Sequence, residues 1–224
     1  MKMVVISTVL SLLFSFCTID GSNKKRLLQE QYSIEYISKD EFEKIVSQYD
    51  FELDKEEFKE EFEQEGSDFQ LPVSDEMVVF NDTLMGTDDP RQKDYKFLGG
   101  IVSINKYVVE GVYWEYSECL IIDKETGKMD TIWSTPFLSP NSKYIASKSL
   151  PYGLEGLPNG IQVFRIEKSE IQKFIEIDQQ EWVPKEVAWS NQNTLVFSYI
   201  KVEEFWSQQE NAPLRYAKLI LKDN

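Results

Sequence analysis

The chain has 224 residues, with 39 acidic and 24 basic side chains, no histidine and a formal net charge of −15. The absence of histidine excludes Ser-His-Asp and Cys-His catalytic triads, the HExxH zinc site and a histidine proton shuttle. The negative charge argues against binding nucleic acid through its phosphates, which requires clustered Lys and Arg. Hydrophobic residues make up 42% of the chain and 30 side chains are aromatic, which is enough for a core.

The N-terminal segment predicts export. Met1-Lys2-Met3 is a short, weakly positive start, and residues 4–16 carry no charge. A helix that spans a bilayer needs about 20 apolar residues, whereas the apolar region of a signal peptide has about 7–15. We therefore interpret residues 1–20 as a signal and exclude them from the folded domain.

Cys17 directly follows this apolar run, and the segment resembles a bacterial lipoprotein signal, in which lipid is attached to a cysteine. Phe14 and Phe16 stand where such signals usually have Leu and a small residue. Cleavage after Cys17 with free secretion is therefore one alternative, and an uncleaved anchor is another. In the lipoprotein interpretation the protein lies in the outer membrane or periplasm and meets the membrane only through its N-terminal lipid.

The acidity of the chain is local. Residues 30–68 contain 15 acidic and four basic side chains, so they carry −11 of the total charge. Within this stretch Ser38 and Glu41 form a capping box, and Asp54 and Glu57 repeat the pattern. Apolar residues follow each cap at helical spacing, which predicts two short helices over residues 39–49 and 55–65.

Two roles for these helices remain open. They present either a solvated face or an acidic docking surface for a basic partner. The docking alternative assigns candidate contacts to four glutamates of the second helix: Glu56, Glu57, Glu60 and Glu61. No calcium-binding loop motif accompanies them, so we assign no metal to this segment.

From Phe69 onward the hydrophobic period changes to two, which is typical of β-strands. The sequence therefore divides into a signal (1–20), a linker with the acidic helices (21–68) and a β-repeat domain (69–224). Residues 137–147 align without gaps to residues 188–198, and each segment reads as strand, turn, strand. A weaker copy begins with a hairpin over 97–109 and continues with strands at 120–122 and 129–133.

Three turns in this domain resemble those of β-propeller blades: Ser139 to Tyr144 (S-P-N-S-K-Y), Trp189 to Leu195 (W-S-N-Q-N-T-L) and Asp123 to Lys128 (D-K-E-T-G-K). The resemblance covers about 125 residues and implies two and a half to three four-stranded blades. Propellers typically have 4–8 blades, so the chain is too short for an ordinary closed ring. We expect a mainly β protein with two N-terminal helices and an open array of antiparallel blades. A β-sandwich is the alternative.

Few residues suggest catalysis. The sequence has no phosphate-binding loop, no G-x-S-x-G elbow and no paired-cysteine metal motif. Carboxylate chemistry remains, and Glu110, Glu115 and Glu118 lie among aromatic residues that are typical of sugar sites. Cys119 lies in a strand-like run and is interpreted as a buried, inert thiol. Four aspartates in the polar loop 81–96 are assigned to turns.

These patterns favour a non-catalytic, exported protein that recognises another protein or a surface glycan, with no cofactor. Trp206, in the insertion over 203–214, is the best single candidate for a partner contact, because loops often carry binding functions. Two alternatives remain open. One is a secreted hydrolase that uses a pair of carboxylates, as glycosidases do. The other is an acidic inhibitor or immunity-type protein that neutralises a basic target.

Overall fold

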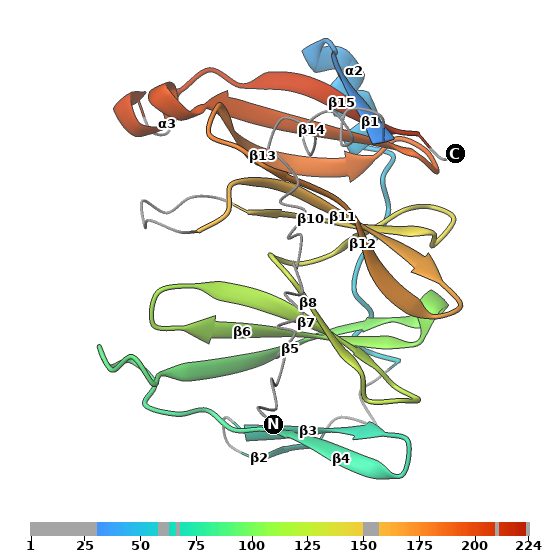
Figure 1. Ribbon diagram of the computed structural model, residues 1–224, viewed down its shortest axis with the longest axis vertical. Coiled ribbons are helices and arrows are strands. Elements are labelled where there is room, and N and C mark those ends of the chain that lie inside the picture. The colour runs from blue at the N-terminus through green and yellow to red at the C-terminus, as the bar shows by residue number, and fades with distance from the viewer. Residues whose placement is uncertain (1–30, 58–62, 66–67, 150–156, 209–210, 223–224) are drawn as a thin grey trace, which may run out of the picture.

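The computed structural model describes residues 31–57, 63–65, 68–149, 157–208 and 211–222. In these ranges the protein is mainly β, with two α-helices and four antiparallel sheets, none of which closes on itself. The sheets stack one above another along the long axis of the molecule (Figure 1). The described residues therefore form four layers of sheet, rather than the two layers of a sandwich.

The sheets follow one another in chain order. The first contains β2 (Glu63–Glu65), β3 (Asp68–Val73) and β4 (Glu76–Phe80). The second contains β5 (Lys93–Ile101), β6 (Lys106–Tyr113), β7 (Ser117–Asp123) and β8 (Met129–Ile132), with the 3-10 helix η1 (Val102–Ile104) after β5. The third contains β9 (Phe137–Leu138), β10 (Tyr144–Ser149), β11 (Gly160–Glu167) and β12 (Glu170–Asp178). The fourth contains β13 (Trp182–Trp189), β14 (Thr194–Lys201), β15 (Arg215–Leu221) and β1 (Tyr32–Tyr36).

The strands predicted in the β-repeat domain are confirmed. β5 and β6 form the hairpin predicted over 97–109, and β7 and β8 follow as the next two strands. The segments 137–147 and 188–198 each form strand, turn, strand, but their pairing differs. Leu138 pairs with Ile145 across six residues, whereas Trp189 pairs with Leu195 across five. The gapless alignment is therefore wrong by one residue beyond the turn.

The N-terminal strand β1 belongs to the last sheet, although the sequence assigned its residues to a linker. It runs antiparallel to β15, from Tyr32 opposite Leu221 to Tyr36 opposite Ala217. Its residues are too few and too exposed to reveal a strand by alternation alone. The pairing joins the first described strand of the chain to the last one.

Apolar side chains fill each space between adjacent sheets. Phe69, Leu71, Tyr107 and Val109 are part of the cluster between the first and second sheets. Val108, Ile121, Ile145 and Phe164 belong to the cluster between the second and third sheets. Tyr144, Val163, Leu195 and Phe197 belong to the cluster between the third and fourth sheets. Each inner sheet thus buries both faces, and its side chains alternate between two cores.

Helix α2 (Lys39–Val46) covers the outer face of the fourth sheet, as the helix at the end of the stack in Figure 1 shows. It begins at the predicted cap, where the Ser38 hydroxyl accepts a hydrogen bond of 3.2 Å from the Glu41 amide. Phe42 is buried against Ala188 and Val196 of that sheet. The first predicted helix is confirmed, and it ends three residues earlier than expected.

The second predicted helix, over 55–65, is wrong where the structure describes it. Asp54 exchanges two backbone hydrogen bonds with Gly100 of β5, at 2.8 and 3.0 Å, and residues 63–65 pair with β3 as β2. The Asp54 carboxylate does accept from the Glu57 amide at 3.0 Å, as a helix cap does. Pairing with a sheet at both ends of the segment outweighs its local helix signals. Residues 58–62 lie outside the described ranges.

Residues 47–54, here called the strap, run from α2 along the edge strands of three sheets (Figure 1). The Tyr49 hydroxyl donates to the Leu138 carbonyl of β9 at 2.9 Å, and Phe51 and Leu53 pack against the core between the second and third sheets. Open strand edges attract other strands. The strap therefore protects the edge formed by β13, β9 and β5.

Candidate functional site

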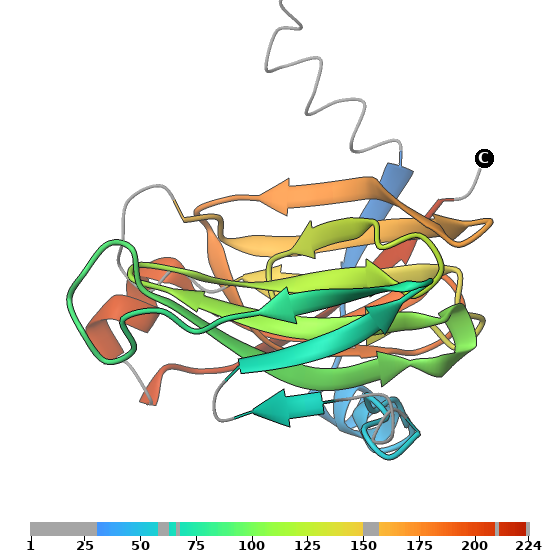
Figure 2. The same ribbon diagram turned by 90° about the horizontal axis from the view of Figure 1, so that it is seen from below.

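The two ends of the strands carry different connections. At one end the turns are short, including those over 102–105, 139–143 and 190–193. At the other end lie the long connection over residues 81–92 and the helix-containing connection between β14 and β15. Viewed along the stack, helix α3 (Val202–Gln208) lies at this second end (Figure 2). We call it the loop-rich end and examine it first, because binding residues are concentrated on loops.

A cavity of about 360 Å³ opens at the loop-rich end between the second and third sheets. Four segments line it, namely the β6–β7 hairpin, the end of β8 with the following crossover, the end of β10 and the approach to β11. The lining residues are Tyr116, Ser117, Glu118, Thr131, Ile132, Trp133, Ser134, Lys148, Ser149, Leu157 and Pro158. Pockets for small molecules typically have volumes of about 300–1,000 Å³. The cavity thus has the size of a ligand site.

The lining combines two aromatic rings with several hydroxyl groups. Tyr116 is 46% exposed and stacks on Tyr113 with ring centroids 4.6 Å apart. Trp133, on the crossover between the sheets, is partly buried. Sugar rings present both apolar C–H faces and hydroxyl groups, and a lining of this kind matches both.

Hydrogen bonds fix the crossover to the third sheet. The Trp133 amide donates to the side-chain oxygen of Gln162 on β11 at 3.2 Å, and the same oxygen accepts from Ser147. The Ser134 hydroxyl accepts from the Lys148 amide at 3.3 Å. Gln162 is almost completely buried. The wall of the cavity is therefore held in place before any ligand arrives, which lowers the entropic cost of binding.

Lys148 and Glu118 are the charged residues among those that line the cavity. The Lys148 ammonium donates to the Lys185 carbonyl of β13. Among the described residues, no carboxylate oxygen lies within ion-pairing distance of Lys148 or Lys185, although the chain has a large acidic excess. Burial lowers the pKa of Lys148, and the nearby Lys185 charge lowers it further, while Glu186 acts in the opposite direction.

A second cavity, of about 630 Å³, lies beneath the strap. Its walls are mostly apolar and include Tyr49, Phe51 and Leu53 of the strap. Lys148 also lines this cavity, as does Lys185. Lys148 therefore lines both cavities.

The proposed carboxylate group of the sequence does not converge. Glu110 pairs across the strands with Cys119, whereas Glu118 pairs with Gly111. Neighbouring residues of a strand point to opposite faces, so Glu110 and Glu118 lie on opposite faces of the second sheet. Glu118 accepts a hydrogen bond of 3.2 Å from the Tyr113 hydroxyl. Glu110 and Glu118 therefore do not form the close carboxylate pair that a glycosidase needs.

Cys119 is a free thiol, buried to 1% exposure in the core between the second and third sheets. Burial and the nearby Glu110 charge raise its pKa to about 12, against a hydrogen bond with Thr135 that lowers it. The thiolate is the reactive form of cysteine. Cys119 is accordingly a core residue, as the sequence predicted.

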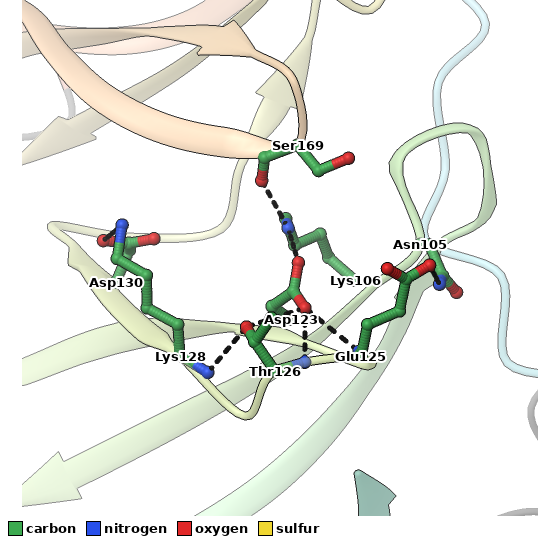
Figure 3. Close-up of polar contacts among 8 residues, drawn as sticks. All are labelled: Asn105, Lys106, Asp123, Glu125, Thr126, Lys128, Asp130 and Ser169. Carbon is green, nitrogen blue, oxygen red and sulfur yellow. Dashed lines mark hydrogen bonds and ion pairs between the residues drawn. The ribbon is translucent and has the colours of Figure 1, made fainter. Parts of the chain in front are cut away.

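The most buried ion pair of the described residues, Lys106 with Asp123, has a structural role. Lys106 of β6, 2% exposed, pairs with Asp123, and the Lys106 ammonium also donates to the Ser169 carbonyl at 2.6 Å (Figure 3). Ser169 lies in the β11–β12 turn of the next sheet. Asp123 also accepts from the amide and the hydroxyl of Thr126, at 2.7 and 2.9 Å. The group thus shapes the β7–β8 turn and connects the second sheet to the third.

The candidate contacts from the sequence lie apart. Trp206 is 50% exposed on α3, at the loop-rich end. Glu56 and Glu57 are exposed beyond Asp54, near the short-turn end of β5. Cys17, Glu60 and Glu61 lie outside the described residues. The structure therefore does not bring Glu56 and Glu57 into one site with Trp206.

The sequence patterns did not predict the cavity, and they did not identify Lys148 as a residue that lines it. Alternation along β10 indicates which face Lys148 occupies, but only the stacking of sheets shows that it lines two cavities. Trp133 also lines the cavity.

The polar loop before β5 uses its aspartates for turns. Asp82 accepts from the Tyr95 amide at 2.8 Å, and Asp89 makes a double contact with the Arg91 guanidinium at 2.7 and 2.9 Å. In the described parts of the chain, no three His, Cys, Asp or Glu side chains are grouped so that they could hold a metal ion. Neither described helix is long and apolar enough to cross a membrane.

No protein-family model, curated protein or solved structure matches the chain. The fold and the site alone define its class, which is a mainly β protein of four stacked antiparallel sheets. A cavity of ligand size opens at its loop-rich end.

Proposed function

We propose that this protein is a non-catalytic, exported binding protein that recognises a glycan at its loop-rich end. The observation that supports this best is the cavity of about 360 Å³, in which Tyr116 and Trp133 stand beside hydroxyl side chains. Its wall is fixed by the Gln162 and Ser134 hydrogen bonds. An enzyme of the glycosidase type would instead need two carboxylates about 5–10 Å apart in a cleft.

In this proposal the four sheets are propeller-like blades in an open array. The turn motifs at Asp123, Ser139 and Trp189 support it, as does the order of strands within the second and third sheets. Such blades are scaffolds, and their function resides in the loops and cavities they carry. The export signal at residues 1–20 and lipid attachment at Cys17 belong to the same proposal.

Binding of the purified protein to an array of oligosaccharides tests the function. We expect Tyr116→Ala to weaken the binding of the selected glycan by about tenfold or more, because a central aromatic contact contributes at least about 1.4 kcal/mol. Tyr36→Ala is the matched control, since Tyr36 is 80% exposed on β1 and does not line the cavity. Its affinity should equal that of the unchanged protein.

The variant Trp206→Ala distinguishes between two candidate locations of the glycan-binding site, the helix α3 and the cavity. If it abolishes glycan binding while Tyr116→Ala has no effect, the binding site lies on α3 and the cavity is not used. If no oligosaccharide binds and a pull-down instead recovers a protein partner, the glycan proposal is wrong.

A further inference from the structure

We propose that the first sheet, at the end of the stack in Figure 1, binds an extended segment of a partner protein along the free edge of β4. The bound segment forms a fourth strand of that sheet. In the described ranges the first sheet has three strands, whereas each of the other sheets has four. This inference does not rest on the proposed glycan-binding function.

The fourth strands of the other sheets cover one another. On the edge away from the strap, the second, third and fourth sheets end in β8, β12 and β1. Ile132 of β8 and Ile171 of β12 belong to one core, and Tyr32 of β1 packs on the core that contains Ile175 of β12. The first sheet ends in β4, so the described chain has no strand at the corresponding place above β8.

The face of β8 that turns toward the first sheet is exposed. Met129 of β8 pairs with Ile122 of β7, so both side chains lie on the face that packs on the first sheet. Ile122 is fully buried, whereas Met129 is 44% exposed, and Thr131 on the same face is exposed as well. The Ser74 amide of the β3–β4 turn donates to the Lys124 carbonyl of the β7–β8 turn at 2.9 Å. The first sheet therefore covers β7 and leaves β8 open.

The edge of β4 offers backbone groups to this open place. Val73 and Glu76 flank the two-residue β3–β4 turn and pair with each other, and hydrogen-bonded pairs alternate along a hairpin. Met77 and Val79 therefore direct their N–H and C=O groups away from β3. No described strand pairs with β4 on that side. An edge of this kind is a template for another strand.

The surroundings indicate which kind of segment fits. Because β8 extends beneath the open place, a single strand fits there, whereas a second copy would bring its own β8 into the same space. Met77 and Val79 are 42% and 49% exposed on the outer face of β4, and Met129 lies on the inner side. Residues 63–82 contain six acidic side chains and no Lys or Arg. The site therefore fits an extended segment in which apolar residues alternate with basic ones, bound by β-strand addition.

A fluorescent peptide of about ten residues with alternating valine and lysine tests the proposal, since it exceeds the length of a typical edge strand. Fluorescence anisotropy with the whole purified protein measures its affinity. Two matched peptides carry N-methyl groups on the valines or on the lysines, so they keep the charge and lose the N–H groups of one edge. We expect at least one of them to bind about tenfold or more weakly than the parent peptide.

Two measurements locate the bound peptide. At a peptide concentration about tenfold above Kd, the amides of Met77 and Val79 should exchange hydrogen about tenfold more slowly, as NMR would show, while the Val78 amide should not change. Met129→Ser should weaken binding about fivefold, because it removes an apolar contact. Met85→Ser is the matched control, since Met85 is 50% exposed on the loop over 81–92, away from β8, and it should leave the affinity unchanged.

Three results would overturn the proposal. If all three peptides bind equally and the Met77 and Val79 amides gain no protection, the acidic surface alone holds the peptide. If no peptide binds, the edge does not accept a strand of this chemistry. If the two amides become protected in concentrated protein without peptide, and sedimentation shows a dimer, the occupant is a second copy of this chain.

Discussion

At the scale of single residues, the buried pair of Lys106 and Asp123 has a large predictable effect on stability. Burial alone raises the pKa of Asp123, but hydrogen bonds from Lys106 and Thr126 outweigh it and lower the pKa to about 2. A carboxyl whose folded pKa is lowered stabilises the fold above its unfolded pKa, near 3.9, and loses that contribution as the pH falls toward 2.

Asp123→Asn should therefore lower the free energy of unfolding by about 3 kcal/mol at neutral pH, because it leaves the Lys106 charge buried without a partner. The difference from the unchanged protein should shrink between pH 4 and pH 2, as urea denaturation at several pH values would show. Asp89→Asn is the control, since it breaks an exposed pair with Arg91. An equal loss of stability in both variants would contradict the role given to burial.

Gly160 shows a residue requirement that the sequence alone does not reveal. Its φ angle is +149°, and a Cβ atom there would lie 1.8 Å from the Ile177 carbonyl oxygen. Gly160→Ala should thus destabilise the protein by about 3 kcal/mol, through strain and overpacking. Gly86→Ala, with a φ of +67° and open space around the Cβ position, should cost about 1 kcal/mol. Thermal unfolding of both variants measures the contrast, and equal losses would contradict it.

At the scale of elements, the strap is the segment whose role can be tested most directly. Asp54→Pro removes the backbone N–H that donates to the Gly100 carbonyl at 3.0 Å, whereas Asp54→Ala keeps it. We expect the proline variant to lose at least about 1 kcal/mol more stability than the alanine variant. It should also associate at high concentration, because the edge of β5 becomes available. Light scattering measures association, and identical behaviour of the two variants would refute protection by the strap.

Local signals predicted the elements that local interactions determine. The Ser38 cap identified α2, and apolar alternation with Asp and Gly turns identified the hairpins of the second sheet. The prediction of a second helix was wrong because the segment pairs with β3 at one end and with β5 at the other, and this pairing outweighs its capping pattern. The gapless alignment of segments 137–147 and 188–198 was wrong because strand pairing, too, determines which residues correspond. A turn shorter by one residue reverses the face of every following side chain, and only the pairing shows that Leu195 occupies the position of Ile145.

The candidate site was less predictable than the fold. The aromatic residues and carboxylates around 110–118 are close in sequence, yet Glu110 on β6 and Glu118 on β7 lie on opposite faces of the second sheet. Tyr116 and Lys148 lie on different sheets, and no spacing in the chain relates them. Their position at one cavity follows from how the second sheet stacks on the third.

At the scale of the whole molecule, the proposed anchor is the feature that determines where the protein acts. Metabolic labelling with palmitate should mark the unchanged protein, and Cys17→Ala should remove the label. Cys119→Ala is the control, since Cys119 is buried in the folded protein. Label that persists in Cys17→Ala, or is absent from both proteins, would exclude a lipid anchor at Cys17 and favour secretion.

The pairing of β1 with β15 has a consequence for the order in which the protein matures. A ribosome makes Tyr32 long before its partner Leu221, so the fourth sheet is complete only once the residues around Leu221 have been made. The second and third sheets are built from consecutive strands, and their strand pairs can form while the chain is still growing. Until β15 has been made, the sheet that α2 covers lacks the strand that pairs with β1. A chain truncated before residue 215 would leave β1 unpaired, and quality-control proteases would meet that free strand first.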